Sequence, residues 1–296
     1  MRGPPGQCTF VCMKRHSFMH LRGITRERIA AVCALLLLLG ASRPLIAQPT
    51  PAAVAAFNAY AARVESRLAG QHRSDGAFLA TTAFDSGTMR LRKGEPVPAD
   101  PIIEQLTPAT GAEFSGSLLH HWRGTAFVPG AKAADFERLM QDFKDYPQRF
   151  SPQVLRARLV SQSGDRMQAS MRVRQQHVIP VVLDTTYDIT YGRLDTQHGY
   201  SISRSTRIAE IYGAGTNAER ALNADEEHGF LWRLNTYWSY EERDGGLYLQ
   251  IEAVSLTRSI PHGLGWAIRP YIESIPRDSL EFTLRSTCNV LRRKTA

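Results

Sequence analysis

The middle of the chain alternates apolar and polar residues in one segment after another, and this pattern constrains the fold more than any other feature. A period of two places successive side chains on opposite faces of a β-strand. Residues 154–161, 167–175, 178–191 and 200–212 all have the pattern of such strands, and turn residues separate them. Because short turns connect antiparallel neighbours, we predict an antiparallel sheet.

The most aromatic of these segments is LWRLNTYWSYEERDGG, residues 231–246. The sequence Asp244-Gly245-Gly246 supplies the positive φ angles of a tight hairpin turn, and residues 247–256 alternate again as the return strand. We therefore predict a β-hairpin with one apolar and one mixed face. Its apolar face would carry Trp232, Leu234, Thr236, Trp238 and Tyr240.

Three further elements are predicted before these strands. Residues 51–69 have apolar side chains at spacings of three and four, which align on one helix face: Val54, Phe57, Ala61, Val64 and Leu68. Residues 118–129 are predicted to form a strand, and residues 132–146 a helix that follows it.

The C-terminal end is predicted to be two helices. Residues 263–274 form the first, and Ser274 and Pro276 suit the start of the second, because serine caps a helix and proline fits its first turn. Residues 276–292 carry an apolar stripe made of Leu280, Leu284, Cys288 and Leu291. The position of Cys288 on that stripe predicts a buried thiol rather than a nucleophile.

Residues 1–47 have the pattern of a secretory signal peptide. Arginines precede the uninterrupted apolar run of residues 29–40, and a small residue, Ala47, stands at a cleavage position before Gln48. The run is shorter than the about 20 residues that a membrane-spanning helix needs. We predict export to the periplasm or the exterior, with a retained membrane anchor as the alternative. A start at Met19 would leave residues 1–18 untranslated.

The net charge of the whole chain is +8, but most of the excess lies in residues 1–47. That segment holds seven of the 36 basic residues and one of the 28 acidic ones, which leaves 29 and 27, a net charge of +2. A nucleic-acid-binding domain concentrates positive charge on its surface. We therefore predict no nucleic-acid partner.

No catalytic motif or cofactor fingerprint stands out in the sequence. His120 and His121 are adjacent on a predicted strand, so they point to opposite faces and do not readily bind one ion. Asp184 and Asp188 are roughly 13 Å apart along a strand, too far to share a proton. We predict no catalytic residue, no metal site and no cofactor.

Arginines on the predicted strands are stronger candidates for a ligand contact. Arg204 lies on an apolar face, and alternation puts Arg207 on the opposite one. Because burying an unpaired charge is costly, Arg204 needs a partner, and Glu252 or Asp184 could be that partner. The alternative is that Arg204 or Arg233 binds the carboxylate or phosphate of a ligand.

The order of elements from residue 116 is strand, helix, antiparallel strands and a long C-terminal helix. Two stretches accompany it, GTAFVPGAKAADFERLMQDFKDYPQRFSP and EERDGGLYLQIEAVSLTRSIP. With them, residues 116–293 resemble the START-related, polyketide-cyclase-like superfamily (SRPBCC). The resemblance implies an α+β helix-grip fold, in which a curved antiparallel β-sheet grips a long C-terminal α-helix. It also implies a cavity between the two, where related domains hold lipids, sterols or polyketide-like molecules.

Three regions are thus predicted: a signal peptide at 1–47, an N-terminal helix with an irregular extension at 48–115, and a helix-grip domain at 116–296. The leading hypothesis is an exported protein that binds or carries a hydrophobic small molecule, such as a lipid. This molecule could carry an acidic group, and the protein could contact a membrane transiently. The candidate cavity residues are Trp232, Leu234, Trp238, Tyr240, Arg204, Arg233, Trp266 and Tyr271.

Two alternatives stay open beside this hypothesis. One is a cyclase- or hydrolase-type enzyme in the same cavity, for which His121, Asp184 and Glu252 are the available groups. The other is a non-catalytic envelope protein that docks through residues 51–115. An apolar stripe of the first helix left exposed would favour docking, whereas a stripe buried on the sheet would count against it.

Overall fold

The computed structural model describes residues 48–74, 78–80, 101–106, 114–176, 180–259 and 265–295. They belong to one compact unit, Ile46–Ala296. The signal peptide prediction, residues 1–47, lies outside the described residues, as do the side chains of residues 265–273.

The strands form one antiparallel sheet, as the alternation predicted. Its order is β1-β2-β9-β8-β6-β5-β4-β3, and a short β7 pairs with β6 beside this path. The bounds are β1 Ile102–Gln105, β2 Ser117–Pro129, β3 Val154–Ser163, β4 Arg166–Gln176, β5 Pro180–Arg193, β6 His198–Tyr212, β7 Arg220–Ala221, β8 Arg233–Arg243 and β9 Gly246–Arg258. The weakly patterned residues before β2 concealed β1, which is only four residues long.

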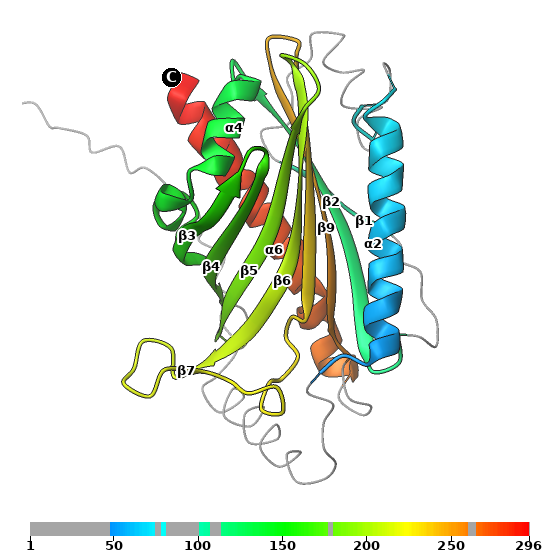
Figure 1. Cartoon of the computed structure of the whole chain (residues 1–296), viewed down its shortest axis with the longest axis vertical. Helices are drawn as coiled ribbons and strands as arrows, with labels where there is room; N and C mark the ends of the chain where they lie inside the picture. Colours follow the sequence, from blue (N-terminus) through cyan, green and yellow to red (C-terminus); the bar gives the residue numbers. More distant parts are fainter. Residues whose placement is uncertain are drawn as a thin grey trace, which may run out of the picture. The chain divides into compact units, whose positions relative to one another are not determined.

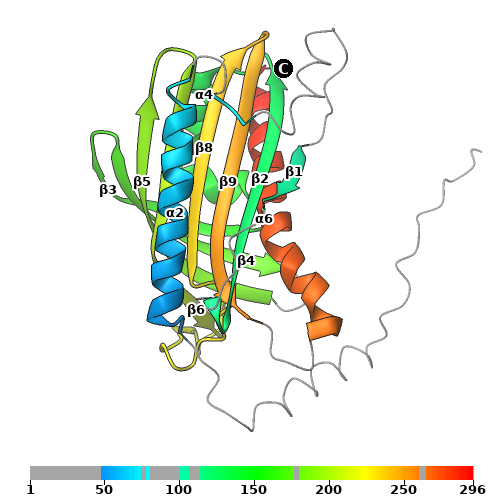
Figure 2. The same cartoon turned by 90° about the vertical axis from the view of Figure 1, so that its right-hand side faces the viewer.

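Two helices cover opposite faces of this sheet (Figure 1 and Figure 2). Helix α6, Gly265–Thr295, crosses the face that we call the inner face, and α2, Pro51–Gln71, lies on the outer face. Buried side chains of α6 pack with β8 and β9, whereas those of α2 pack with a separate set of sheet residues. An antiparallel sheet with a long C-terminal helix against its inner face is the helix-grip arrangement, so the predicted fold class is confirmed.

Helix α6 is continuous, so the predicted break at Ser274 and Pro276 is wrong. Proline removes one backbone donor inside a helix, yet the helix runs through this position. Its stripe of Leu280, Leu284, Cys288 and Leu291 is at most 3% exposed. Local propensity is a weak predictor where tertiary packing acts on the same segment.

The predicted helix of residues 132–146 is instead three short pieces: α4 Ala133–Gln141, the 3-10 turn η3 Phe143–Asp145 and α5 Tyr146–Arg149. The helix ends at Asp142, whose ψ of 70° is not helical. Phe136 and Leu139 of α4 are both 1% exposed and pack in the inner-face core.

Helix α2 is built into the domain rather than projecting from it. Thr50 caps it by accepting a hydrogen bond from the Ala53 amide at 3.1 Å. Four residues of the predicted stripe, Phe57, Ala61, Val64 and Leu68, are at most 5% exposed, whereas Val54 is half-buried and Ala53 is buried in its place. This burial counts against α2 as a docking arm. Within the described residues, no helix combines the length and the apolarity needed to cross a bilayer.

Candidate functional site

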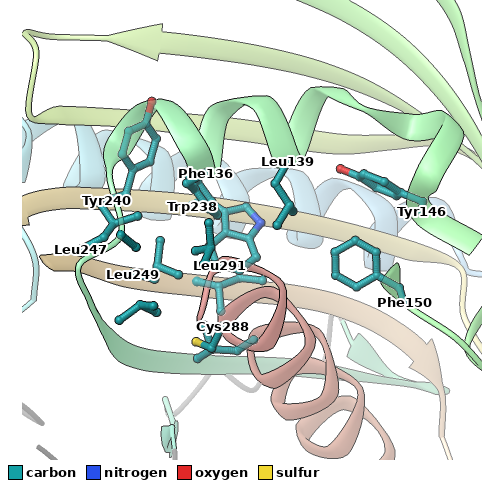
Figure 3. Close-up of a cluster of buried hydrophobic side chains, with 14 of the residues drawn as sticks. Phe136, Leu139, Tyr146, Phe150, Trp238, Tyr240, Leu247, Leu249, Cys288 and Leu291 are labelled. Atoms are coloured by element: carbon teal, nitrogen blue, oxygen red, sulfur yellow. The ribbon is translucent and has the colours of Figure 1, made fainter. Parts of the chain in front are cut away.

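One half of the inner face is a packed core, and it contains two of the predicted cavity residues. Trp238 and Tyr240 are both 3% exposed. Their rings contact the Phe136 ring of α4, with centroids 5.1 and 5.0 Å apart. Figure 3 shows Leu291 and Cys288 of α6 on the other side of this cluster. In this half, therefore, the aromatic strand packs against α4 and α6.

The contact of α6 with β2 marks where this packed half ends. Gly124 has no side chain, and a Cβ atom placed there would lie 2.6 Å from Leu280 Cδ2 and 2.9 Å from Leu284 Cδ2. The helix thus lies directly on the β2 backbone at this glycine. The next inner position along β2 is Trp122, which is half-buried.

Beyond Gly124 five inner-face side chains are only half-buried, although they come from the central strands of the sheet and lie near buried inner-face residues such as His120. Three of the five, Trp122, Leu234 and Ala253, pack against the margin of the inner-face core. The register places Trp122 of β2 beside Ala253 of β9, Ala253 beside Thr236 of β8, and Thr236 beside Ser203 of β6. Leu234 is the next inner residue of β8. We call these residues the accessible half of the inner face: Trp122, Leu234, Thr236, Ala253 and Ser203.

Polar groups border the accessible half. His120 is buried and its Nε2 lies 3.0 Å from the Thr257 hydroxyl. Burial lowers the pKa of His120 to about 4, so its imidazole is neutral at physiological pH. The indole nitrogen of Trp122 is buried and has no hydrogen-bond partner among the described residues. An indole N–H is a donor only, so an acceptor would satisfy it.

The outer face holds a buried ionic cluster that the sequence did not reveal. Glu252 is 1% exposed and accepts hydrogen bonds from Arg123 at 3.0 Å and from Arg67 of α2 at 2.5 Å. His121 Nε2 lies 2.8 Å from the same carboxylate, and its Nδ1 lies 2.8 Å from the hydroxyl of Tyr60. The cluster ties α2 to β2 and β9, and the prediction that His120 and His121 point to opposite faces is confirmed.

Charges around Glu252 control its ionisation. Burial favours the neutral acid, but the hydrogen bond from His121 and the charges of Arg123 and Arg67 outweigh it. Together they lower the pKa of Glu252 to about 2, so it is a carboxylate over the physiological range. The groups available for the enzyme alternative therefore lie away from the accessible half. His121 and Glu252 are beneath α2, and Asp184 pairs with Arg172 at 2.6 Å on the outer face.

The predicted arginine anchors also belong to the outer face. Arg204 makes a bidentate pair with Glu65 of α2, at 2.8 and 2.6 Å, instead of pairing with Glu252 or Asp184. The prediction that Arg207 lies on the face opposite Arg204 is wrong. A bulge in the pairing of β5 with β6 turns Arg207 to the outer face, where Arg204 lies. Arg233 donates to the carbonyl oxygen of Trp232 at 2.8 Å.

Alternation predicted that Trp232 shares the face of Trp238 and Tyr240, and this prediction is wrong. The chain bends at Trp232 before β8 begins, so the strand pattern does not apply to it. Its ring is 4% exposed and packs in the cluster of Phe57 and Leu256 beneath α2. Leu234 alone of the predicted residues lies in the accessible half, and the side chains of Trp266 and Tyr271 lie outside the described residues.

A separate small groove opens on the outer face, where α2 ends over β6 and β8. Its volume is about 190 Å³, and its lining includes Leu68, His72, Leu194, Tyr200 and Ile202. The His72 ring stacks on Tyr200 at 4.8 Å. Burial and the charge of Arg67 lower the pKa of His72 to about 4. Among the described residues, no three histidine, cysteine or acidic side chains converge as metal ligands would.

Comparison with known proteins gives structural likenesses only. No family model matches the sequence, and no curated protein matches it. The structure is similar to a STAR-related lipid transfer protein from Xanthomonas axonopodis, with a TM-score of 0.42, 16% identity, and coverage of 64% of this chain and 98% of that one.

Two further solved structures show a similar degree of likeness. An aromatase/cyclase from Streptomyces sp. R1128 has a TM-score of 0.42 and 13% identity over 60% of this chain and 97% of that one. The human StarD13 lipid transfer and protein localization domain has a TM-score of 0.42 and 7% identity over 70% and 96%.

Proposed function

We propose that this protein binds a hydrophobic small molecule, such as a lipid, between α6 and the accessible half of the inner face. One observation carries the proposal: central-strand side chains stay half-buried on the face that α6 crosses. In a filled core such positions are buried, as Trp238 of β8 and Leu249 of β9 are in the packed half. Ligand sites are largely apolar surfaces with a few placed polar groups.

The lining indicates the kind of molecule. Trp122, Leu234 and Ala253 offer apolar contact, while Thr236 and Ser203 offer hydroxyl groups. The indole N–H of Trp122 has no partner among the described residues, which favours a ligand with a hydrogen-bond acceptor, such as a carbonyl, ester or hydroxyl oxygen. Arg204 is already neutralised by Glu65 on the outer face, so we do not propose it as an anchor for an acidic ligand.

Native mass spectrometry of the protein purified from its own host tests this function. We expect a folded protein that carries one apolar molecule, released when the protein is denatured. If the protein arrives empty, the same instrument measures uptake from a panel of a fatty acid, a sterol and a phospholipid. Protein that is empty on isolation and takes up no member of the panel would overturn the proposal.

Export is proposed together with this function, so the protein would carry its ligand outside the cytoplasm. The support is the sequence pattern of residues 22–47, which lie outside the described residues. Cell fractionation of the host, followed by intact-mass measurement, should find an exported chain that begins at Gln48. A cytoplasmic chain that keeps the whole of residues 1–47 would contradict export and leave the ligand proposal untouched.

A further inference from the structure

A basic and partly apolar surface lies on the β3–β4 hairpin, at one end of the sheet path. Within the described residues β3 pairs with β4 alone, and Figure 2 shows it at the margin of the sheet. The segment from residue 154 to 176 contains a single acid, Asp165, and five arginines: Arg156, Arg158, Arg166, Arg172 and Arg174. Positive charge is therefore concentrated here in a chain that is otherwise nearly balanced beyond residue 47.

Two of the five arginines lie near acidic side chains of the described residues. Arg172 pairs with Asp184 and Glu219, and Arg156 lies 3.9 Å from Glu219. Arg158, Arg166 and Arg174 have no carboxylate partner within the part of the chain that the structure describes. The register places all three on the outer side of the hairpin, beside Ser170, Thr190 and Val182 respectively. Their charges thus act in the same direction.

Two exposed apolar side chains accompany this charge. Leu159 and Val160 are each 42% exposed, and they directly follow Arg158 in β3. Leu159 pairs with Ala169 and so lies on the side of the hairpin opposite the arginines, while Val160 lies in the bulge between Leu159 and Ser161 at the edge of the sheet. The described residues contain only two other large hydrophobic side chains as exposed as these, Leu194 after β5 and Tyr212 at the end of β6. When the edge of a hairpin meets a bilayer, side chains of both sides reach it, and arginines there suit the lipid headgroups while apolar side chains suit the boundary with the acyl chains.

A second copy of the chain is a poorer occupant for this edge. The pairing of β3 with β4 is interrupted between Val154 and Arg156 and again between Leu159 and Ser161. Such bulges twist an edge strand and hinder the addition of another strand. Antiparallel pairing of two β3 strands would also bring Arg156 and Arg158 near their own copies, which is repulsive.

We propose that the β3–β4 surface, defined by Arg158, Arg166, Arg174, Leu159 and Val160, docks the protein on a bilayer that contains anionic lipid. The charge complementarity of arginine with anionic headgroups carries the attraction, and the two apolar side chains enter the interface. Docking is independent of the proposed ligand site, because none of these residues belongs to the accessible half. An empty protein would dock as well.

Vesicle sedimentation tests this surface with the protein purified from its host. We expect binding to vesicles of phosphatidylcholine mixed with phosphatidylglycerol, little binding to phosphatidylcholine alone, and weakening as salt is raised. One arginine near an anionic surface contributes about fivefold in affinity, so R158E/R166E should bind at least about 25-fold more weakly. L159S/V160S should also bind less, and the matched control R73E/R138E should keep most of its affinity.

Circular dichroism and thermal melting identify any variant that fails to fold. The vesicle binding of the folded variants then tests the proposal. Equal binding to both kinds of vesicle, or equal loss in R158E/R166E and R73E/R138E, would overturn the proposal. Dimerisation in solution that L159S/V160S abolishes, without any vesicle binding, would assign the surface to a second copy and overturn it too.

Discussion

At the level of single residues, the carboxylate of Glu252 lies between Arg123, Arg67 and His121 and is 1% exposed. Glutamine at this position removes the negative charge and leaves two guanidinium groups beside each other. Breaking a buried ionic cluster in this way costs about 3–5 kcal/mol. We expect E252Q to lower the free energy of unfolding by this amount in urea denaturation.

An exposed ion pair supplies the control for that measurement. Glu226 pairs with Arg220 at 2.6 Å on the surface, where solvent screens the attraction. E226Q should therefore change the free energy of unfolding far less than E252Q does. Equal losses in the two variants would show that the outer-face cluster is not the stabilising feature that its burial suggests.

The acid limb of stability should also depend on Glu252. Its pKa in the folded protein is about 2, below the ordinary 4.5. A carboxyl group with a lowered folded-state pKa stabilises the protein above its unfolded pKa, and this contribution is lost as pH falls toward the folded value. Between about pH 4.5 and 2 the free energy of unfolding should fall more steeply for the wild type than for E252Q. Parallel curves from denaturation at stepped pH would contradict this.

The sequence predicted part of this residue-level picture and could not predict the rest. Strand periodicity was enough to put His120 and His121 on opposite faces. The partners of Glu252 were hidden, because Arg67 lies 185 residues away and reaches Glu252 only once α2 covers the outer face. The same holds for Arg204, whose partner Glu65 is also on α2.

At the level of elements, the contact of α6 with β2 depends on the absence of a side chain at Gly124. G124A would place a Cβ atom 2.6 Å from Leu280 Cδ2, so the leucine or the helix must shift. Overpacking of this kind costs about 1–3 kcal/mol. Gly70 in α2 has no atom within 4 Å of such a Cβ, so G70A should be neutral or stabilising. Thermal melts that move both variants in the same direction would contradict this contact.

Helix α2 should contribute to stability as part of the domain. Phe57 is 1% exposed in the cluster beneath α2, and truncating a buried phenylalanine costs about 3–5 kcal/mol. F57A should lose this amount in urea denaturation, while N58A, on the exposed side of the same helix, should lose little. If F57A behaves as N58A does, α2 is a loosely attached arm, and the docking alternative gains support.

The bounds of a helix or strand could be predicted where the apolar pattern extended over many residues. The predictions were wrong where they depended on a single residue. Residues 51–69 were expected to be helical and α2 spans Pro51–Gln71. The break that Pro276 suggested is absent, because the buried stripe holds α6 along one line. One bulge and one bend set the faces on which Arg207 and Trp232 lie. A register change of one residue is enough to move a side chain to the other face of a sheet.

At the level of the whole molecule, the fold class followed from element order, whereas the location of a ligand site did not. Alternation identified an aromatic face, but it could not show that α4 fills the space beside Trp238 and Tyr240. The accessible half became visible only from burial beside the contact of α6 with Gly124. Its Trp122 and Ala253 carry no sequence signal that separates them from ordinary strand residues.

A space-filling substitution tests whether the accessible half has room. Ala253 lies between Trp122 and Thr236 in the register. A253F should keep the free energy of unfolding, because its ring would occupy the proposed ligand site. In a filled core the same ring would cost about 1–3 kcal/mol. A218F, in an exposed loop, controls for the added aromatic residue.

The native mass spectrum of A253F, purified from the host alongside the wild type, tests most directly whether a ligand binds at the accessible half. We expect the wild type to carry a hydrophobic molecule and a folded A253F to carry none, with A218F like the wild type. A folded A253F that carries the same molecule at the same occupancy would contradict a ligand site on this half of the inner face.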